Sequence, residues 1–145
     1  MYNRCGNFGL CRILNSPICT CIQGFEPRNR GQWNSGNWSG GCIRRNLLQC
    51  EGNRTSDGFF LMKGVKLPDY ADTILADNSN ECKGECLRNC SCNAYTFVTG
   101  IGCMIWSGDL VDVEHFAEGG EQLYIRLANS ELGQVISLPF VCSQI

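Results

Sequence analysis

The sequence predicts a small disulfide-rich α+β protein in which one helix packs on an antiparallel sheet. Three observations support this fold class. The chain has 12 cysteines in 145 residues, which is the density of a disulfide scaffold. Cys82, Cys86 and Cys90 repeat every four residues, so in a helix they lie along one face. Residues 122–128 alternate apolar and polar side chains, as a half-buried strand does.

Residues 1–50 show little helical or strand periodicity and are rich in glycine and proline. Such a segment cannot bury enough apolar surface alone, so cysteine loops must hold it together. Cys19 and Cys21 are separated by one residue and followed by Gly24-Phe25, a pattern typical of the hairpin core of an EGF-like module. Alternation along a strand would direct the two sulfurs to opposite faces.

Residues 51–132 carry the stronger periodic signals, after a polar link at 51–57. Asn78 and Glu81 resemble a capping box, which predicts a helix running to about Arg88, with Asn89 as a left-handed exit. A proline at position 68 ends the first apolar run. The expected strands lie at residues 59–62, 92–98, 102–106 and 122–128.

The cysteine-bearing helix is either joined by disulfides to a neighbouring sheet or holds a metal. Zinc sites favour CxxC pairs or Cys/His clusters, whereas this chain has no CxxC, and its one histidine, His115, is distant in sequence. These spacings favour disulfides, without cofactor or metal. A cysteine-rich redox or zinc-binding protein remains the alternative.

Three Asn-x-Ser/Thr triplets, at Asn37, Asn53 and Asn89, agree with a secretory history. The sequence shows neither a signal peptide after Met1 nor a run of about 18 apolar residues that could span a membrane. We therefore expect a fragment of a longer secreted or membrane-bound protein, with a stand-alone decoy as the alternative. We expect no membrane insertion by the chain itself.

The net charge of −2 indicates no particular partner. Residues 1–50 carry six arginines and a single acid, Glu26, but these arginines are scattered among tight cysteine loops. A solvated surface explains them better than a nucleic-acid site, so we expect no nucleic-acid partner.

The run CGNFGLC…SPICTCIQGFEP…W…W…GGCIRR…LQC resembles the EGF-like region of plant S-domain (G-type lectin) receptor-like kinases and S-locus glycoproteins. Modules of that family begin with one more cysteine. The resemblance implies the disulfides Cys5–Cys19 and Cys21–Cys42, and it leaves Cys11 without its partner.

The motifs DGF, VKLPD, ECKGECLRNCSCNAY, GCMIWSGDL and EQLYIRLANSEL follow in the order of the family's PAN/apple module. The resemblance implies the disulfides Cys82–Cys103 and Cys86–Cys92. Cys82 and Cys86 point the same way and cannot easily bond each other within a regular helix, so both implied pairs are physically permitted.

Cys50 and Cys90 then remain, and we expect them to pair. Cys11 and Cys142 are left over as candidate unpaired cysteines. Residues 133–145 form a tail that departs from the family, in which a membrane helix and a kinase follow. We thus expect a truncated EGF-like module at 1–50, a PAN/apple module at 51–132 and an atypical tail.

The sequence shows no catalytic residues. His115 lies near Asp112 and Glu114, but we interpret it as an exposed loop histidine, because no nucleophile accompanies it. We expect Trp106 to fill the core against the helix. Trp33 and Trp38 are expected to pack within the loop closed by Cys21–Cys42, with a partner or glycan contact as the alternative.

The resemblance implies a non-enzymatic recognition and assembly region on the extracellular side of the plasma membrane. It would bind protein or carbohydrate ligands, support the pairing of receptor ectodomains, and serve pollen recognition or defence signalling. The serine/threonine kinase domain of the family is absent from this chain.

Overall fold

The computed structural model describes residues 1–52 and 57–132. The described chain contains short strands in its N-terminal part and longer ones afterwards, with the α-helices α1 (Arg30–Asn34) and α2 (Ser79–Arg88), a 3₁₀ turn at Gln49–Gly52 and a further helical turn at residues 129–132. The strands are β1 (Gly9–Cys11), β2 (Cys19–Cys21), β3 (Phe25–Pro27), β4 (Cys42–Arg44), β5 (Gly58–Lys66), β6 (Asp72–Ile74), β7 (Ala94–Val98), β8 (Gly102–Trp106), β9 (Val113–His115) and β10 (Glu121–Leu127).

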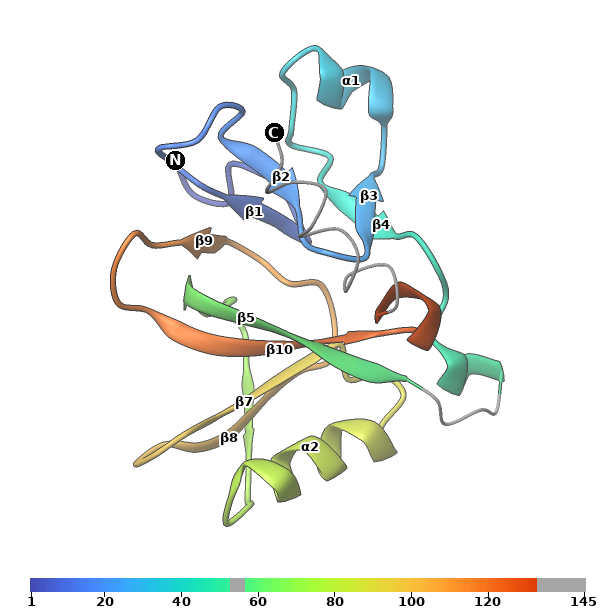
Figure 1. Ribbon diagram of the computed structural model, residues 1–145, viewed down its shortest axis with the longest axis vertical. Helices are drawn as coiled ribbons and strands as arrows, with labels where there is room; N and C mark the ends of the chain where they lie inside the picture. Colours follow the sequence, from blue (N-terminus) through green and yellow to red (C-terminus); the bar gives the residue numbers. More distant parts are fainter. Residues whose placement is uncertain (53–56, 133–145) are drawn as a thin grey trace.

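The described strands form one mixed sheet, ordered β2-β1-β9-β5-β10-β7-β8-β6, and a separate β3–β4 ladder (Figure 1). The longest strands, β5 and β10, pair antiparallel at the centre of the large sheet. β1 joins β9 in parallel, with Leu10 opposite Val113. This parallel pairing connects the N-terminal hairpin to the rest of the sheet.

Helix α2 covers one face of the sheet, across β7 and β8 (Figure 1). The expected cap is present, because the side chain of Asn78 accepts a hydrogen bond from the Glu81 amide at 2.9 Å. The Glu81 carboxylate reaches back to the Asp77 amide rather than to that of Asn78. The expected left-handed exit is wrong, since Asn89 is extended at φ −116°.

The N-terminal part of the chain packs on the opposite face of the sheet. Phe8, Ile22 and Phe25 share one core cluster with Leu123 and Ile125 of β10. Trp106 is buried in this cluster and not against α2, which corrects the predicted packing. Residues of β8 alternate between the two faces, so Cys103 and Ile105 contact the helix side while Trp106 faces away.

Residues 1–50 contain more regular structure than their sequence pattern indicates. Their four strands are each three residues long, and α1 has five residues. Periodicity cannot be recognised over such short runs. These elements are stabilised by pairing with distant strands and by disulfides.

Five disulfides join ten of the 11 described cysteines. They pair Cys5 with Cys19, Cys21 with Cys42, Cys50 with Cys90, Cys82 with Cys103, and Cys86 with Cys92. These are the pairs expected above. Cys11 is buried and free, and Cys142 lies outside the described residues.

Candidate ligand-binding surface

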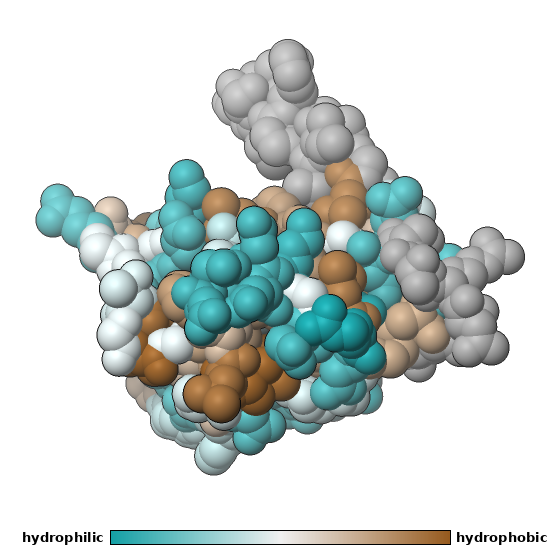
Figure 2. All heavy atoms as spheres, turned by 90° about the horizontal axis from the view of Figure 1, so that it is seen from below, coloured by the Kyte–Doolittle hydropathy of each residue, from teal (hydrophilic) through white to brown (hydrophobic). Residues whose placement is uncertain are grey.

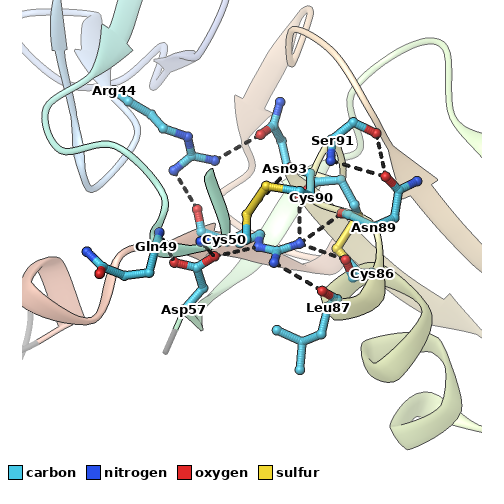
Figure 3. A network of polar contacts seen from close by, with 12 residues as sticks. Arg44, Gln49, Cys50, Asp57, Cys86, Leu87, Asn89, Cys90, Ser91 and Asn93 are labelled. Atoms are coloured by element: carbon cyan, nitrogen blue, oxygen red, sulfur yellow. Dashed lines mark hydrogen bonds and ion pairs between the residues drawn. A yellow bond between two sulfur atoms is a disulfide. The ribbon is translucent and has the colours of Figure 1, made fainter. Parts of the chain in front are cut away.

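The loop that follows α2 is fixed by a buried guanidinium, that of Arg126 on β10. Its Nε donates to the carboxylate of Asp57 at 3.1 Å, and both side chains are at most 2% exposed. Its two other nitrogens donate to backbone carbonyls at and beyond the end of the helix, as Figure 3 shows for part of this set. The accepting carbonyls belong to Cys86, Leu87, Asn89 and Cys92.

Asp57 connects this network to the N-terminal part of the chain. Its carboxylate also accepts from the amides of Gln49 at 2.6 Å and Cys50 at 3.3 Å. The Cys50–Cys90 disulfide joins the same two segments (Figure 3). The Arg126 network is therefore structural, and it leaves no group free for chemistry on a ligand.

A second buried carboxylate, that of Glu131, fixes the chain after β10 to the segment after β4. Arg45 donates to it through Nε at 3.1 Å and Nη2 at 3.0 Å, and Asn46 donates through its amide. The hydrogen bonds from Arg45 hold the pKa of Glu131 below its ordinary value of 4.5, against the opposing effect of burial. A depressed pKa means that the folded state favours the charged carboxylate.

Glu131→Gln is expected to flatten the acid side of the stability profile. In the native chain the contribution of Glu131 is fully present above pH 4.5, the ordinary pKa of the unfolded chain, and is lost as pH falls through the lower folded value. Urea unfolding at pH 7 and pH 3 measures the difference. Glu118→Gln removes the same charge at an exposed position and is the matched control. An unchanged pH dependence in Glu131→Gln would contradict this assignment.

The acidic residues near His115 do not assemble a catalytic cluster. Asp112 accepts from the Asn3 amide at 2.6 Å and lies 3.3 Å from Lys66 Nζ, so it joins the N-terminus to β5. His115 ends β9 and is half-buried, which corrects its placement in an exposed loop. Its strand neighbour Glu114 lines a small hollow beside Met1 instead.

A surface contact between Tyr2 and Asp69 lies next to this junction. The Tyr2 hydroxyl donates to Asp69, which also accepts from Lys66 Nζ at 3.1 Å. These hydrogen bonds, that of Tyr2 first, lower the pKa of Asp69, and the same bond raises the pKa of Tyr2. The contact orders the N-terminal segment against the loop after β5.

Metal and thiol chemistry find no support in the described part of the chain. Residues 1–52 and 57–132 contain no group of three or more His, Cys, Asp or Glu side chains arranged to hold a metal. Cys82, Cys86 and Cys90 each have a disulfide partner. Burial, followed by the charge of Glu114, raises the pKa of the Cys11 thiol, which disfavours the reactive thiolate.

Two of the three sequon asparagines lie on the surface with the same pattern of side-chain hydrogen bonds. Asn37 Oδ1 accepts from the amide and hydroxyl of Ser39, at 3.3 and 2.8 Å. Asn89 Oδ1 accepts from the amide and hydroxyl of Ser91, at 3.1 and 2.7 Å. Both asparagines are exposed, whereas Asn53 lies outside the described residues.

Trp33 and Trp38 contact each other edge to face, with ring centroids 6.5 Å apart. Both are half-buried against the cysteine cluster formed by Cys5, Cys11 and Cys19, within the loop that the Cys21–Cys42 disulfide closes. Their packing role was predicted. Neither ring is fully exposed on the surface as a separate ligand-binding site.

The main candidate surface is a groove between the β1–β2 hairpin and strands β5 and β9. It consists of two adjoining hollows of about 500 and 400 Å³ that share Arg12 and His115. Phe60, Leu61 and Met62 of β5 line the larger hollow. Ile13, Leu14 and Phe116 line the smaller one, and Leu14 is 89% exposed. We call these two hollows the β5 groove.

The β5 groove is basic. Arg12, Lys63 and His115 line it, and its lining contains no Asp or Glu. Within residues 1–52 and 57–132, the side chains of Arg12 and Lys63 make no hydrogen bond or ion pair. Sequence reasoning missed this groove, because its walls come from segments that are distant in sequence. Unpaired cations beside an apolar run were the one local signal.

A smaller hollow of about 260 Å³ lies beside Tyr70, which is 80% exposed. Asp72 and Asp109 line it, so its character is acidic. The face seen from below α2 shows small hydrophobic patches separated by hydrophilic residues (Figure 2). None of the helices in the described ranges is long and apolar enough to cross a membrane.

Comparison with known proteins defines the class. A PAN-like domain model matches residues 50–113, and an S-locus glycoprotein domain model matches residues 1–29. Both are non-catalytic domains. The described part of the chain accordingly folds as a small disulfide-rich domain that is mostly sheet with few helices.

Comparison with individual relatives shows which kind of protein carries these domains. The chain is 52% identical over 138 residues to the G-type lectin S-receptor-like serine/threonine-protein kinase B120 of Arabidopsis thaliana, a match covering 92% of this chain and 16% of that protein. Another Arabidopsis thaliana kinase of the same description is 50% identical over 134 residues, covering 90% and 16%. The chain is thus a homologue of the PAN and S-locus ectodomain segment of G-type lectin S-receptor-like kinases. It spans about a sixth of their length, and the kinase part is not covered.

Proposed function

We propose that this chain is a non-catalytic recognition and assembly region on the extracellular side of the plasma membrane, within a receptor-like kinase. It binds a protein or carbohydrate ligand and supports the pairing of receptor ectodomains, in pollen recognition or defence signalling. The observation that carries the proposal is the match to receptor kinases of this type at about half identity over nine-tenths of the chain.

The division into modules belongs to this proposal. Residues 1–50 form a truncated EGF-like module, residues 51–132 a PAN/apple module, and residues 133–145 an atypical tail. The hairpin of β1 and β2 and the disulfide Cys21–Cys42 support the first assignment. Helix α2 on its antiparallel strands, with Cys82–Cys103, supports the second.

An extracellular location agrees with the number of disulfides, because such bonds persist in oxidising compartments and are rare in the cytosol. Five bridges join ten of the chain's 12 cysteines. A reducing compartment would remove the crosslinks on which the short N-terminal strands depend.

Asn37, Asn53 and Asn89 are proposed to carry N-linked glycans. Secretion of the chain from a plant cell is expected to give a product whose mass falls on treatment with a peptide-N-glycosidase that accepts plant glycans. Asn37→Gln and Asn89→Gln should each remove one glycan, since both side chains are exposed. Thr55→Ala, which destroys only the Asn53 triplet, is the matched variant for the third site. A secreted chain without any glycan at Asn37 or Asn89 would contradict the proposal.

A receptor chimera tests the proposed function. The matching segment of B120 is replaced by this chain, and a second receptor lacks the segment altogether. We expect the chimera to be detected by antibody on intact cells and to autophosphorylate as B120 does, while the deleted receptor does neither. A chimera that folds but stays inside the cell, or that behaves as the deletion does, would overturn the proposal.

A further inference from the structure

We propose that an extended acidic segment of a partner protein binds in the β5 groove by adding a strand to the unpaired edge of β5. This inference rests on the proposed recognition function and names the chemistry of the partner. Three observations carry it: the direction of the backbone groups of β5, the shape of the groove and its charge.

The first observation is that half of β5 has a neighbour on one side only. β10 pairs with it from Gly58 to Val65, whereas β9 pairs with it at Val65 and Lys66. Beyond that point the amide of Phe116 donates to Gly64 O at 2.8 Å. Residues 59–63 have no strand partner on the β9 side within the described chain.

The pairing of β10 shows which backbone groups of β5 are open. The amide of Arg126 donates to Asn93 O, so Tyr124 and Arg126 direct their backbone groups toward β7, and Ile125 directs its own toward β5. Phe60, opposite Ile125, is therefore bonded to β10. Leu61, opposite Tyr124, points its N–H and C=O away from β10 and toward the groove. An open edge of this kind is a template for an added strand.

The groove lies along β5 beyond the end of β9. β9 ends at His115, and both hollows of the groove include this residue. A strand added here would lie between β5 and the segment after β1 that carries Arg12. Its alternate side chains would face Phe60 on one side of the sheet and Lys63 on the other.

The third observation is the charge of the lining. Arg12, Lys63 and His115 face the groove with no carboxylate among the lining residues. Glu114, the neighbour of His115, lines the hollow beside Cys11 instead. The groove therefore favours a segment that alternates apolar side chains with carboxylates, and it disfavours a basic one.

The experiment uses a fluorescein-labelled peptide of about eight residues that alternates valine and glutamate, since eight extended residues exceed the five-residue edge. Fluorescence anisotropy follows its binding to the full, oxidised chain. The same peptide N-methylated at every backbone amide keeps its charge but has no amide left to donate to a strand edge, and a valine–lysine peptide reverses the charge. We expect saturable binding of the first peptide and none of the other two.

Three variants of the chain locate the site. Arg12→Glu/Lys63→Glu reverses the charge of the groove and should weaken binding at least tenfold, roughly the effect of like charges at an interface. Leu61→Pro removes an amide that points away from β10, a position where an edge strand tolerates proline, and should abolish binding. Lys83→Glu makes one such charge reversal on the exposed surface of α2 and should change affinity less than about twofold. Circular dichroism confirms that each variant is folded.

Several results would overturn the inference. Equal binding of the N-methylated peptide would exclude strand addition. Tighter binding of the peptide by Lys63→Ala would mean that Lys63 protects the edge of β5 from pairing with an added strand. Displacement of the peptide by polygalacturonate, with no effect of Leu61→Pro, would assign the groove to a carbohydrate. Concentration-dependent dimerisation abolished by Arg12→Glu/Lys63→Glu would assign it to a second copy of this chain. A functional B120 chimera alongside any of these results would leave the proposed function standing.

Discussion

Replacing Arg126 by methionine is expected to lower the free energy of unfolding by about 3–5 kcal/mol, the cost of breaking a buried ion pair by removing one partner. The substitution keeps the apolar stem of the side chain but removes every donor of the guanidinium. It leaves the Asp57 carboxylate, which is 1% exposed, without its cation. It also leaves the carbonyls of Cys86 and Leu87 without the hydrogen bonds that Arg126 donates.

Equilibrium unfolding in urea under oxidising conditions measures the effect. Arg88→Met is the matched control, because Arg88 makes an exposed pair with Glu85 on the surface of α2 and arginine and methionine have similar helix propensity. We expect the control to change stability by less than about 0.5 kcal/mol. A loss below about 1 kcal/mol in Arg126→Met would show that the network does not fix the helix end.

The second large effect concerns the disulfide that joins α2 to β8. Replacing both Cys82 and Cys103 by alanine should cost about 2–5 kcal/mol, since the bridge closes a loop between residues 21 positions apart. Both sulfurs are completely buried between the helix and the sheet. The double substitution avoids leaving a free thiol that could exchange with other bridges.

Cys11→Ala is the control for this pair, because it removes a buried cysteine that forms no bridge in the structure. We expect its cost to be about 1 kcal/mol, the contribution of burying one small side chain. Thermal unfolding of the oxidised proteins compares the two variants. Equal losses in both would mean that the Cys82–Cys103 bridge adds nothing beyond the packing of its sulfurs.

The longer elements of the PAN-like half could be read from the sequence because their signals are local, whereas the three-residue strands β6 and β9 were not predicted. Asn78 and Glu81 marked the start of α2, and the spacing of Cys82 and Cys86 placed both sulfurs on its inner face. The alternation of residues 122–128 marked β10. The disulfide partners required the family resemblance, because spacing alone leaves several pairings open.

Contacts between distant segments could not be read in this way. β1 and β9 are each three residues long, and their parallel pairing joins residues about a hundred positions apart. The alternation of residues 122–128 gives no sign that Arg126 is buried, yet its side chain lies beneath the end of α2. The β5 groove depends on the same long-range arrangement, since its lining residues Lys63, His115 and Arg12 come from β5, β9 and the segment after β1.

Disulfides hold this fold together, and Cys82–Cys103 joins α2 to the sheet. Mass spectrometry of peptides from the unreduced chain tests it most directly. We expect crosslinked peptides containing Cys82 with Cys103, Cys86 with Cys92, and Cys50 with Cys90. Cys82 or Cys86 found with another partner, or as a free thiol after expression in an oxidising compartment, would contradict it.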